Sequence, residues 1–516
     1  VEFIKGSAST LYGGGAIAGL VNLISKVPEK TPELTVLLNG TTAKGVDASI
    51  FYSQKWHHIG TTIFGSYNYN GAYDPSNTGL SAIPQTNRFT INPKVFLYVD
   101  DHNSGWLGVN TTYEKRLGGD VQVIDGKADN LHRYFERNKT FRFSTQLSFT
   151  HKIDGESSVN FKNTAGYFDR QLGEPGFVFK GRQLSSFSEL NYVRNGEKTS
   201  WVAGADLITD HFSTGPPRSD LNCDLTTVGA FIQNTYKATN WFSLETGLRL
   251  DNNTLAPNKP SGGYFFLPRA NALFKITDHL TSRIGGGLGY KMPTLFNDES
   301  ERDGYQHIQP LNTGNTRAEQ SYGLNGDLNY RNKLGDEAVI NINQLFFYTR
   351  VDRPLILQNN SFINAPGYLT TQGAETNIKL VMDELVFYLG YTYTNTKQHF
   401  SGITNEQPLT PKHQFSFDST YEIEGSFRFG AESFYTAPQH LNDGTNGRSY
   451  ITFGLLVQKM WKHLDIFINA ENLTDQRQTK WGSIYNGSIT NPDFKDIYAP
   501  LDGVVVNAGI RIKILN

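Results

Sequence analysis

The sequence predicts an all-β protein, a 22-stranded antiparallel transmembrane β-barrel with a short N-terminal segment inside it. Runs of about ten residues that alternate apolar and polar side chains recur along the chain, and the connections between them alternate between short and long. The composition agrees, since aromatic residues make up 13% of 516 residues, glycine numbers 50, and charged residues are only 19%. A charged fraction of about 25% is usual for soluble domains.

The alternation is clearest at 242–251, 385–394, 464–471 and 504–514. Because successive side chains of a strand point to opposite faces, each run is predicted as a strand with one apolar and one polar side. We expect the apolar side to face lipid and the polar side to face the lumen. The lipid-facing examples are Leu248, Tyr391, Ile468 and Ile510, and the lumenal ones are Arg249, Thr392, Asn469 and Arg511.

The connections divide into two classes. Tight turns such as Asp154-Gly155 and Asn195-Gly196 represent the short class. Between the connections lie 22 strands from residue 33 onward, and short turns at one rim with long loops at the other are typical of outer-membrane barrels. A soluble propeller is the alternative, but the blade repeat of about 40–50 residues is missing. The long connections are expected at about 70–87, 117–139, 169–180, 211–225, 251–262, 292–317, 351–367, 397–408, 437–449 and 475–502.

Charge and cysteine content exclude several other classes. Lys and Arg number 47 and Asp and Glu 49, so the net charge of −2 gives no reason to expect a nucleic-acid partner. Cys223 is the one cysteine, which excludes an intrachain disulfide and a Cys-based metal site. No stretch of about 18 apolar residues occurs, so a membrane-spanning helix is not expected. We expect no enzyme, no intrinsic cofactor and no resident metal.

The segment 1–32 has a different pattern from the rest. Short strands are predicted at 1–5 and 20–25, with a helical turn and a glycine-rich bend between them. The spacing Gly13-x-Gly15-x-x-Ala18 formally matches a dinucleotide fingerprint, which requires a helix after the glycines. A strand follows instead, so nucleotide binding is not predicted.

Residues 1–26, read as Val-Glu-Phe-Ile-Lys-Gly-Ser-Ala-Ser-Thr-Leu-Tyr-Gly and onward to Asn-Leu-Ile-Ser-Lys, closely resemble the end of the plug domain of TonB-dependent outer-membrane receptors. The matching motif positions include Gly6, Tyr12, Gly13 and Asn22, while Ser7 replaces the usual proline. Later segments also resemble this family, at 289–293, 310–321, 364–375 and 469–475. The resemblance covers the whole chain and implies a 22-stranded barrel.

The resemblance also implies the domain organisation and the partners. We expect 1–32 to be the C-terminal remnant of the plug, 33–516 to be the barrel, and the chain to be the C-terminal part of a longer receptor. The implied activity is active import of a scarce solute across the outer membrane of a Gram-negative bacterium. The implied partners are the TonB–ExbB–ExbD energy-transducing complex, outer-membrane lipid and a small chelate.

A ferric siderophore is the expected cargo, with haem and cobalamin as alternatives within the family and a passive porin as the alternative of another class. A porin would lack the segment 1–26. Binding groups concentrate on loops held by a rigid scaffold. The candidate ligand-binding residues are therefore Tyr305, His307 and Gln309 in one long loop, and His132, Arg133 and Tyr134 in another. His307 suits haem iron, whereas aromatic and basic side chains suit a siderophore.

Overall fold

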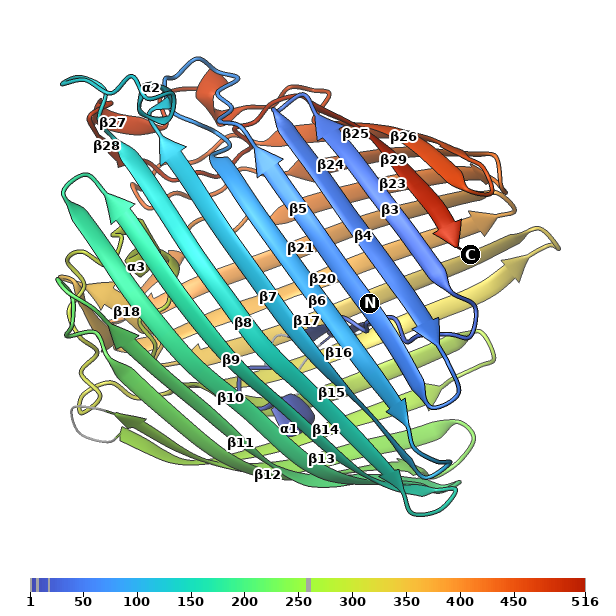
Figure 1. Ribbon diagram of the computed structural model, residues 1–516. Coiled ribbons are helices and arrows are strands. Elements are labelled where there is room, and N and C mark those ends of the chain that lie inside the picture. Colours follow the sequence, from blue (N-terminus) through green and yellow to red (C-terminus); the bar gives the residue numbers. More distant parts are fainter. Residues whose placement is uncertain (1, 6–8, 17–18, 257–260, 516) are drawn as a thin grey trace.

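The protein is described from a computed structural model, which covers residues 2–5, 9–16, 19–256 and 261–515. Its 22 wall strands pair antiparallel with their neighbours, and β29 (Val505–Leu515) pairs with β3 (Glu33–Thr41) to close the ring (Figure 1). The predicted fold class and strand number are confirmed. Closure leaves the wall without a free edge, as a bilayer requires.

The remaining wall strands are β4 (Gly45–Lys55), β5 (Ile59–Asn70), β6 (Gln85–Tyr98), β7 (Asn103–Gly119), β8 (Phe135–Lys152), β9 (Ser157–Glu174), β10 (Phe177–Asn195), β11 (Thr199–Thr214), β12 (Cys223–Lys237), β13 (Phe242–Ala256), β14 (Ser261–Lys275), β15 (Leu280–Lys291), β16 (Glu319–Leu334), β17 (Ala338–Asp352), β20 (Gly367–Met382), β21 (Leu385–Phe400), β23 (His413–Ile423), β24 (Phe427–Thr436), β25 (Tyr450–Met460) and β26 (Leu464–Glu471). The connections contain α2 (Val121–Ile124), α3 (Asp298–Arg302), β18 (Leu355–Gln358), β19 (Ser361–Asn364), β22 (Ile403–Glu406), η1 (Gln478–Lys480), β27 (Tyr485–Ser488) and β28 (Asn491–Phe494).

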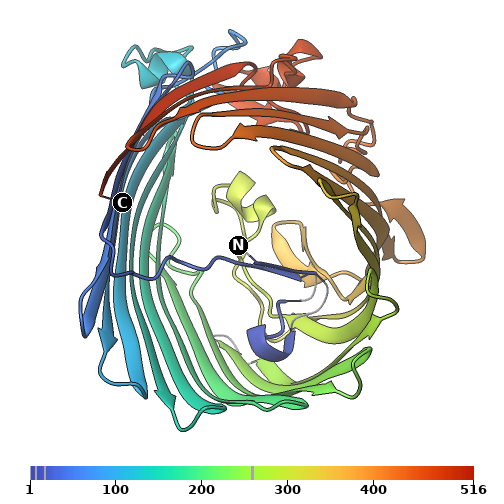
Figure 2. The same cartoon turned by 90° about the vertical axis from the view of Figure 1, so that its right-hand side faces the viewer.

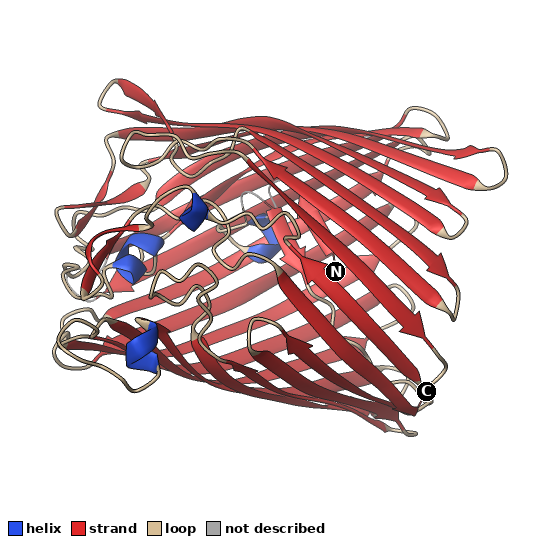
Figure 3. Cartoon of the chain, turned by 90° about the horizontal axis from the view of Figure 1, so that it is seen from above, coloured by secondary structure: helices blue, strands red, loops and turns tan. Residues whose placement is uncertain are grey.

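Short turns gather at one rim of the barrel and long loops at the other (Figure 1), and most of the helical turns lie toward the long-loop rim (Figure 3). The prediction of a long connection at 169–180 is wrong. The ladder of β9 and β10 continues to the pair Glu174–Phe177, and Gly176, at a φ of 82°, closes a tight turn. The polar residues that suggested a loop extend the hairpin instead, because strand pairing needs only backbone groups.

The apolar faces point outward. Leu248, Ile468 and Ile510 are 47%, 54% and 39% exposed, as lipid-facing side chains are when no lipid is present. Arg249, the next residue after Leu248, is 2% exposed and contacts the segment inside the barrel, so it is lumenal. Cross-strand partners share a face, which places Tyr391 with Phe415, Thr392 with Gln414, Asn469 with Asn507 and Asp465 with Arg511.

Tryptophans mark the level of the short turns. Trp56, Trp241 and Trp461 lie beside three of these turns and are 46%, 55% and 46% exposed. Aromatic girdles of this kind flank the apolar band of membrane barrels. In the part of the chain that the structure describes, no helix is long and apolar enough to cross a bilayer.

The N-terminal segment lies inside the lumen (Figure 2). Its strands β1 (Glu2–Lys5) and β2 (Gly19–Asn22) form a separate two-stranded sheet, and α1 (Ser9–Tyr12) lies between them in sequence. The helix α1 packs against β12, β13, β14 and β15 of the wall. The segment therefore occupies the lumen and does not add a strand to the barrel.

Candidate ligand-binding mouth of the barrel

The connection from β15 to β16, residues 292–318, folds inward over the lumen, where its helix α3 appears inside the ring of strands (Figure 2). Asn297 caps this helix, and its side-chain oxygen accepts a hydrogen bond from the Ser300 backbone N–H at 2.9 Å. Asx side chains at this position satisfy a helix donor that would otherwise lack a partner. The cap fixes the start of a five-residue helix that ends at Arg302.

A buried hydrophobic cluster, here the mouth cluster, holds this loop to the wall. Tyr305 is 1% exposed and its ring stacks on Phe179 of β10 with centroids 4.4 Å apart. Such aromatic pairs stabilise a structure beyond the apolar area they bury. The mouth cluster consists of Leu172, Phe179, Phe212, Leu221, Leu255, Leu295, Tyr305, Ile308, Leu311 and Phe362.

Ion pairs and hydrogen bonds reinforce the cluster. Arg170 of β9 binds both carboxylate oxygens of Glu301, at 2.6 and 2.7 Å. Arg218, in the neighbouring loop, donates to the backbone oxygens of Tyr305 at 2.6 Å and of Gln306 at 2.8 Å. Planar guanidinium groups suit such multidentate contacts. The loop is therefore held by both apolar and polar contacts.

The pKa values of two side chains in this loop differ from their ordinary values. Burial acts to raise the pKa of the Glu301 carboxyl, but hydrogen bonds from Arg170 and Tyr305 offset it, and the pKa lies below its ordinary value. Burial, with a further contribution from the Glu301 hydrogen bond, raises the pKa of the Tyr305 phenol. The phenol stays protonated and donates to Glu301 at 2.5 Å.

The other two predicted residues of this loop are exposed. His307 has a 61% exposed side chain, and its Nδ1 lies 2.8 Å from an oxygen of Asp303. Gln309 donates its backbone N–H to Asn360 at 2.7 Å, and its side chain is exposed. Tyr305, by contrast, lies in the mouth cluster and offers no open face in this conformation.

The second predicted group lies elsewhere on the rim. Nδ1 of His132 is 2.7 Å from Asp120, which is fully buried, and Arg133 is exposed. Tyr134 packs against Phe494 with ring centroids 5.8 Å apart. Tyr134 also lines a cavity of about 290 Å³, whose other lining residues include Arg116 and Glu136 but none of the predicted residues at 305–309. This cavity is therefore lined by a residue of the second predicted group and by none of the first.

Sequence reasoning missed a larger cavity between α3 and the last two long loops. This basic cavity has a volume of about 490 Å³. Its lining includes the cations Arg302, Arg448 and Lys495 and the carboxylates Asp443 and Asp496, so cations exceed anions by 3 − 2 = 1. It also includes the aromatic residues Trp481 and Tyr498, whose rings stack with centroids 6.1 Å apart. These residues come from three connections distant in sequence, so no local motif announces them. The one feature of the sequence that could have indicated this cavity is the mixture of aromatic and basic residues in 475–502.

Asp496, only 7% exposed at its side chain, organises one wall of the basic cavity. It lies 3.8 Å from Arg302 and accepts the backbone N–H of Asn442 at 2.7 Å. Gln478 donates to the Asp496 backbone oxygen at 2.7 Å. The three connections that form the cavity therefore hold one another in place.

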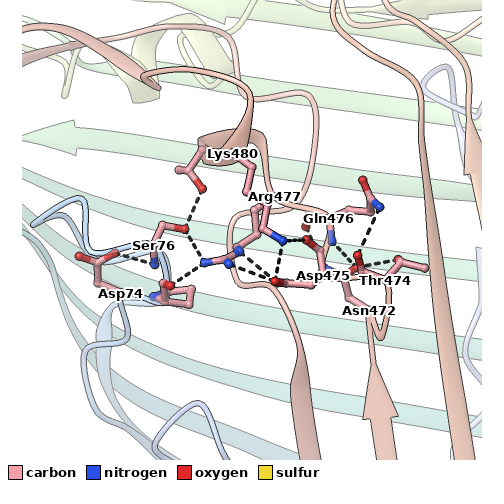
Figure 4. A network of polar contacts seen from close by, with 10 residues as sticks. Asp74, Ser76, Asn472, Thr474, Asp475, Gln476, Arg477 and Lys480 are labelled. Atoms are coloured by element: carbon pink, nitrogen blue, oxygen red, sulfur yellow. Dashed lines mark hydrogen bonds and ion pairs between the residues drawn. The ribbon is translucent and has the colours of Figure 1, made fainter.

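A polar network joins the first long loop to the last one (Figure 4). Arg477 donates to the Pro75 backbone oxygen at 2.5 Å and to the Ser76 hydroxyl at 3.0 Å, while Asp475 accepts from Arg477 and from Lys480. Asn472 begins this turn with a φ of 49° and accepts the Gln476 N–H at 3.0 Å. The network gives residues 472–475, noted above for their resemblance, a structural role.

The floor of the lumen is set by contacts of the N-terminal segment. Tyr290 donates its backbone N–H to the Gly14 oxygen at 3.1 Å, and Arg249 lies 3.5 Å from the Thr10 oxygen.

Of the plug-motif positions, Gly13 has a φ of 82°, Tyr12 is 49% exposed, and Asn22 donates to Glu2 at 2.9 Å. Gly6 lies outside the described residues. Among the described residues, no group of three or more His, Cys, Asp or Glu side chains is placed to hold a metal ion.

A closed barrel of 22 membrane-crossing strands, with a folded segment in its lumen and folded loops over its mouth, defines an outer-membrane transport protein. Residues 52–473 match the family described as "TonB dependent receptor-like, beta-barrel". The chain belongs to this family, whose members are receptors and transporters rather than enzymes.

Solved structures with the same fold have low sequence identity to this chain. The ferric-catecholate import receptor Fiu from E. coli K12 is 13% identical, with a TM-score of 0.75 over 99% of this chain and 85% of that one. The copper transporter OprC is 14% identical, with a TM-score of 0.79 over 99% and 85%. The ferric yersiniabactin uptake receptor FyuA from Yersinia pestis is 16% identical, with a TM-score of 0.73 over 99% and 84%.

Proposed function

We propose that this receptor captures a ferric siderophore at the basic cavity and imports it with energy from the TonB–ExbB–ExbD complex. The observation that supports this most is the cavity of about 490 Å³ that combines Arg302, Arg448 and Lys495 with Trp481 and Tyr498. Ligand sites of about 300–1,000 Å³ with a few convergent polar groups are typical for small molecules.

The chemistry of a siderophore suits these side chains. A ferric siderophore already fills the coordination positions of its iron, so the protein needs no metal ligand. Its complexes with catecholate or carboxylate groups carry negative charge, which guanidinium and ammonium groups attract. Their planar aromatic parts can stack on Trp481 or Tyr498 and on arginine. The cargos named for Fiu and FyuA, ferric catecholates and ferric yersiniabactin, belong to this class.

We also infer that residues 1–32 are the C-terminal part of a plug domain and that residues 33–516 are the barrel it closes. The plug-like motif supports this, as does the position of α1 and of the sheet β1–β2 in the lumen. Movement of the segment would have to break its contacts with Arg249 and Tyr290. Import on this proposal is active transport, unlike diffusion through a porin.

Haem is a second candidate because of His307. Its Nδ1 is held by Asp303 at 2.8 Å, and the side chain is 61% exposed. Histidines that bind a metal through one nitrogen commonly have the other nitrogen fixed by a carboxylate. An exposed imidazole held in this way could approach haem iron.

The test is the affinity of the purified receptor for ferric siderophores of the catecholate and carboxylate classes. The double variant Arg448→Ala/Lys495→Ala should bind an anionic ferric complex at least about tenfold more weakly, a free-energy loss of about 1.4 kcal/mol. Trp481→Ala should also weaken it. The control Lys462→Ala, at a short turn of the opposite rim, should bind as the parent does. Equal affinities of the double variant and the parent for all these complexes would refute the proposal.

A further inference from the structure

The last long loop, residues 475–502, separates two cavities at the mouth of the barrel. One is the basic cavity, and the other is the cavity of about 290 Å³ that Tyr134 lines, here the loop cavity. The lining of the loop cavity comes from three parts of the chain, within 74–84, 116–138 and 479–501. Arg170, which binds Glu301 of α3, also donates to Asn138 of this lining at 3.3 Å. The loop cavity therefore lies on the lumenal side of the wall.

Neighbouring residues of the last long loop face different cavities. Ser483 lines the basic cavity, and the next residue, Ile484, lines the loop cavity. The same division holds for Asp496 and Ile497. Phe494 belongs to both linings. The partition between the two cavities is therefore a single chain thick at these positions, and the side chain of Phe494 borders both sides.

The loop cavity has apolar side chains that are partly open to it. Phe494 and Ile497 are 37% and 43% exposed, whereas Leu80 and Ile484 of the same lining are 4% and 7% exposed. Large apolar side chains gathered at a concave surface often mark a ligand site. A cavity of about 150 Å³ with an apolar lining holds benzene. The loop cavity, at about 290 Å³, has room for a longer hydrocarbon group.

The charges of the two linings differ in sign. The loop cavity has one cation, Arg116, and two carboxylates, Asp74 and Glu136, which sum to 1 − 2 = −1. The charged residues of the basic cavity sum to 3 − 2 = +1. Arg116 is already paired with Glu114 at 2.7 Å, which weakens its attraction for another anion. An anionic chelate is therefore favoured in the basic cavity and disfavoured in the loop cavity.

We propose that the cargo is an amphiphilic ferric siderophore, with its anionic iron-binding head in the basic cavity and its acyl tail in the loop cavity. This inference rests on the proposed function, because it takes the basic cavity as the site of the head. The shared border at Phe494 lets one molecule reach both cavities. Burial of a hydrocarbon chain among apolar side chains is favourable through the hydrophobic effect. A cargo without a tail would leave Phe494 and Ile497 in contact with water.

The test compares two ferric complexes of a citrate-based siderophore that differ only in the acyl group on the hydroxamate nitrogen, which is acetyl in one and octanoyl in the other. Affinities are measured with the purified receptor in lipid nanodiscs. Two variants alter the loop cavity. Ile497→Asn makes its lining more polar without adding charge, and Ala82→Phe fills it. The matched control is Ile403→Asn, since Ile403 is 62% exposed in another long loop and lines neither cavity.

The parent and Ile403→Asn should bind the octanoyl complex at least about tenfold more tightly than the acetyl complex. Ile497→Asn and Ala82→Phe should lose most of this preference. Both should bind the acetyl complex as the parent does, which also shows that they are folded. Equal affinities of the parent for the two complexes would overturn the tail site and leave the proposed function intact. A preference that both cavity variants retain would also overturn the tail site, because the tail would then be partitioning into the bilayer.

The double variant Arg448→Ala/Lys495→Ala separates this inference from the proposed function on which it rests. It should lose affinity for both complexes by a similar factor and keep the preference for the octanoyl complex. Undiminished binding of both complexes by this variant would refute the basic cavity as the site of the head, even if the loop-cavity variants changed the preference. A parent receptor that binds neither complex would overturn the proposed function and the tail site together.

Discussion

Arg249 of β13 forms a buried, bidentate ion pair with Asp206 of β11, directly beside the N-terminal segment in the lumen. The two Nη–Oδ distances are 2.7 and 2.9 Å, and the exposed fractions of the two side chains are 1% and 2%. Asp251 lies 2.7 Å from Nε of the same guanidinium. One cation thus compensates two buried carboxylates, while its Nη1 also reaches the Thr10 oxygen at 3.5 Å. The pair links the stability of the wall to the position of α1.

Replacing Arg249 by leucine should therefore destabilise the receptor strongly. The change leaves Asp206 and Asp251 buried without their cation, although the Tyr290 phenol still donates to Asp251 at 2.7 Å. The loss of the cation is expected to lower the free energy of unfolding by about 3–5 kcal/mol. Denaturant unfolding in lipid or detergent, followed by tryptophan fluorescence, measures the loss. The control is Arg428→Leu, since Arg428 and Glu422 are each 37% exposed at the side chain. A partly exposed pair should contribute less than about 1 kcal/mol. Equal losses in the two variants would contradict the special role of Arg249.

The wall was predictable because its pattern is local. Neighbouring residues such as Leu248 and Arg249 alternate between apolar and polar, and this alternation directly indicates which side chain faces lipid and which faces the lumen. Each turn dipeptide lies in sequence beside the strands that it joins. The site was less predictable because it is assembled from distant connections. Trp481 meets Arg302 across the basic cavity only after the barrel has closed. Tyr305 was predicted as a ligand-binding residue from its loop position, yet such a position does not reveal that Phe179 buries it.

The position of Tyr305 leads to a second prediction, which separates an anchoring role from ligand contact. Tyr305→Ala should remove the stack on Phe179 and open a void in the mouth cluster, a change that costs about 3 kcal/mol or more for a buried aromatic residue. Amide hydrogen exchange in 292–317 should become faster. Tyr305→Phe keeps the ring but loses the hydrogen bond to Glu301, so exchange should rise much less than in Tyr305→Ala, and ligand affinity should stay close to that of the parent. A Tyr305→Phe variant that folds normally but binds no ligand would show that the phenol itself contacts the cargo.

The third prediction concerns pH. Glu301 has a pKa below its ordinary value, because hydrogen bonds from Arg170 and Tyr305 outweigh the effect of burial. The ionised carboxylate therefore stabilises the docked conformation of the loop, and this stabilisation is fully present above the ordinary glutamate pKa of about 4.3. This contribution is lost as the pH falls through the lowered pKa. Exchange rates in 292–317, corrected for intrinsic rates, should stay constant from pH 7 to about pH 5 and rise in stronger acid. Glu301→Gln should exchange faster at pH 7 and lack the acid-dependent rise.

The fourth prediction tests the assignment of faces in the closing strand. Ile510 lies opposite Ile466 on one side and Leu38 on the other, all on the outward face. Ile510→Arg places a charge in the apolar band and should lower stability in bilayers by up to about 2–4 kcal/mol if it is near the midplane. Asn507→Arg on the lumenal face is the control and should fold with near-parent stability. Equal stability of Ile510→Arg and the parent would show that the face assignment is wrong.

The last prediction separates the two cargos proposed for the mouth. A ferric siderophore presents saturated iron and is held by charge and stacking, whereas haem has an open axial position that an imidazole can fill. His307→Ala should therefore leave the affinity for ferric siderophores within about twofold of the parent value, since His307 does not line the basic cavity. If haem is the cargo, the same variant should lose the Soret shift on mixing with haem, and Asp303→Asn should weaken binding by freeing the ring that Asp303 orients. Gln309→Ala, an exposed neighbour, is the control for both measurements. A parent receptor that shows no Soret shift with haem, together with siderophore binding that depends on Arg448 and Lys495, would leave the siderophore as the cargo.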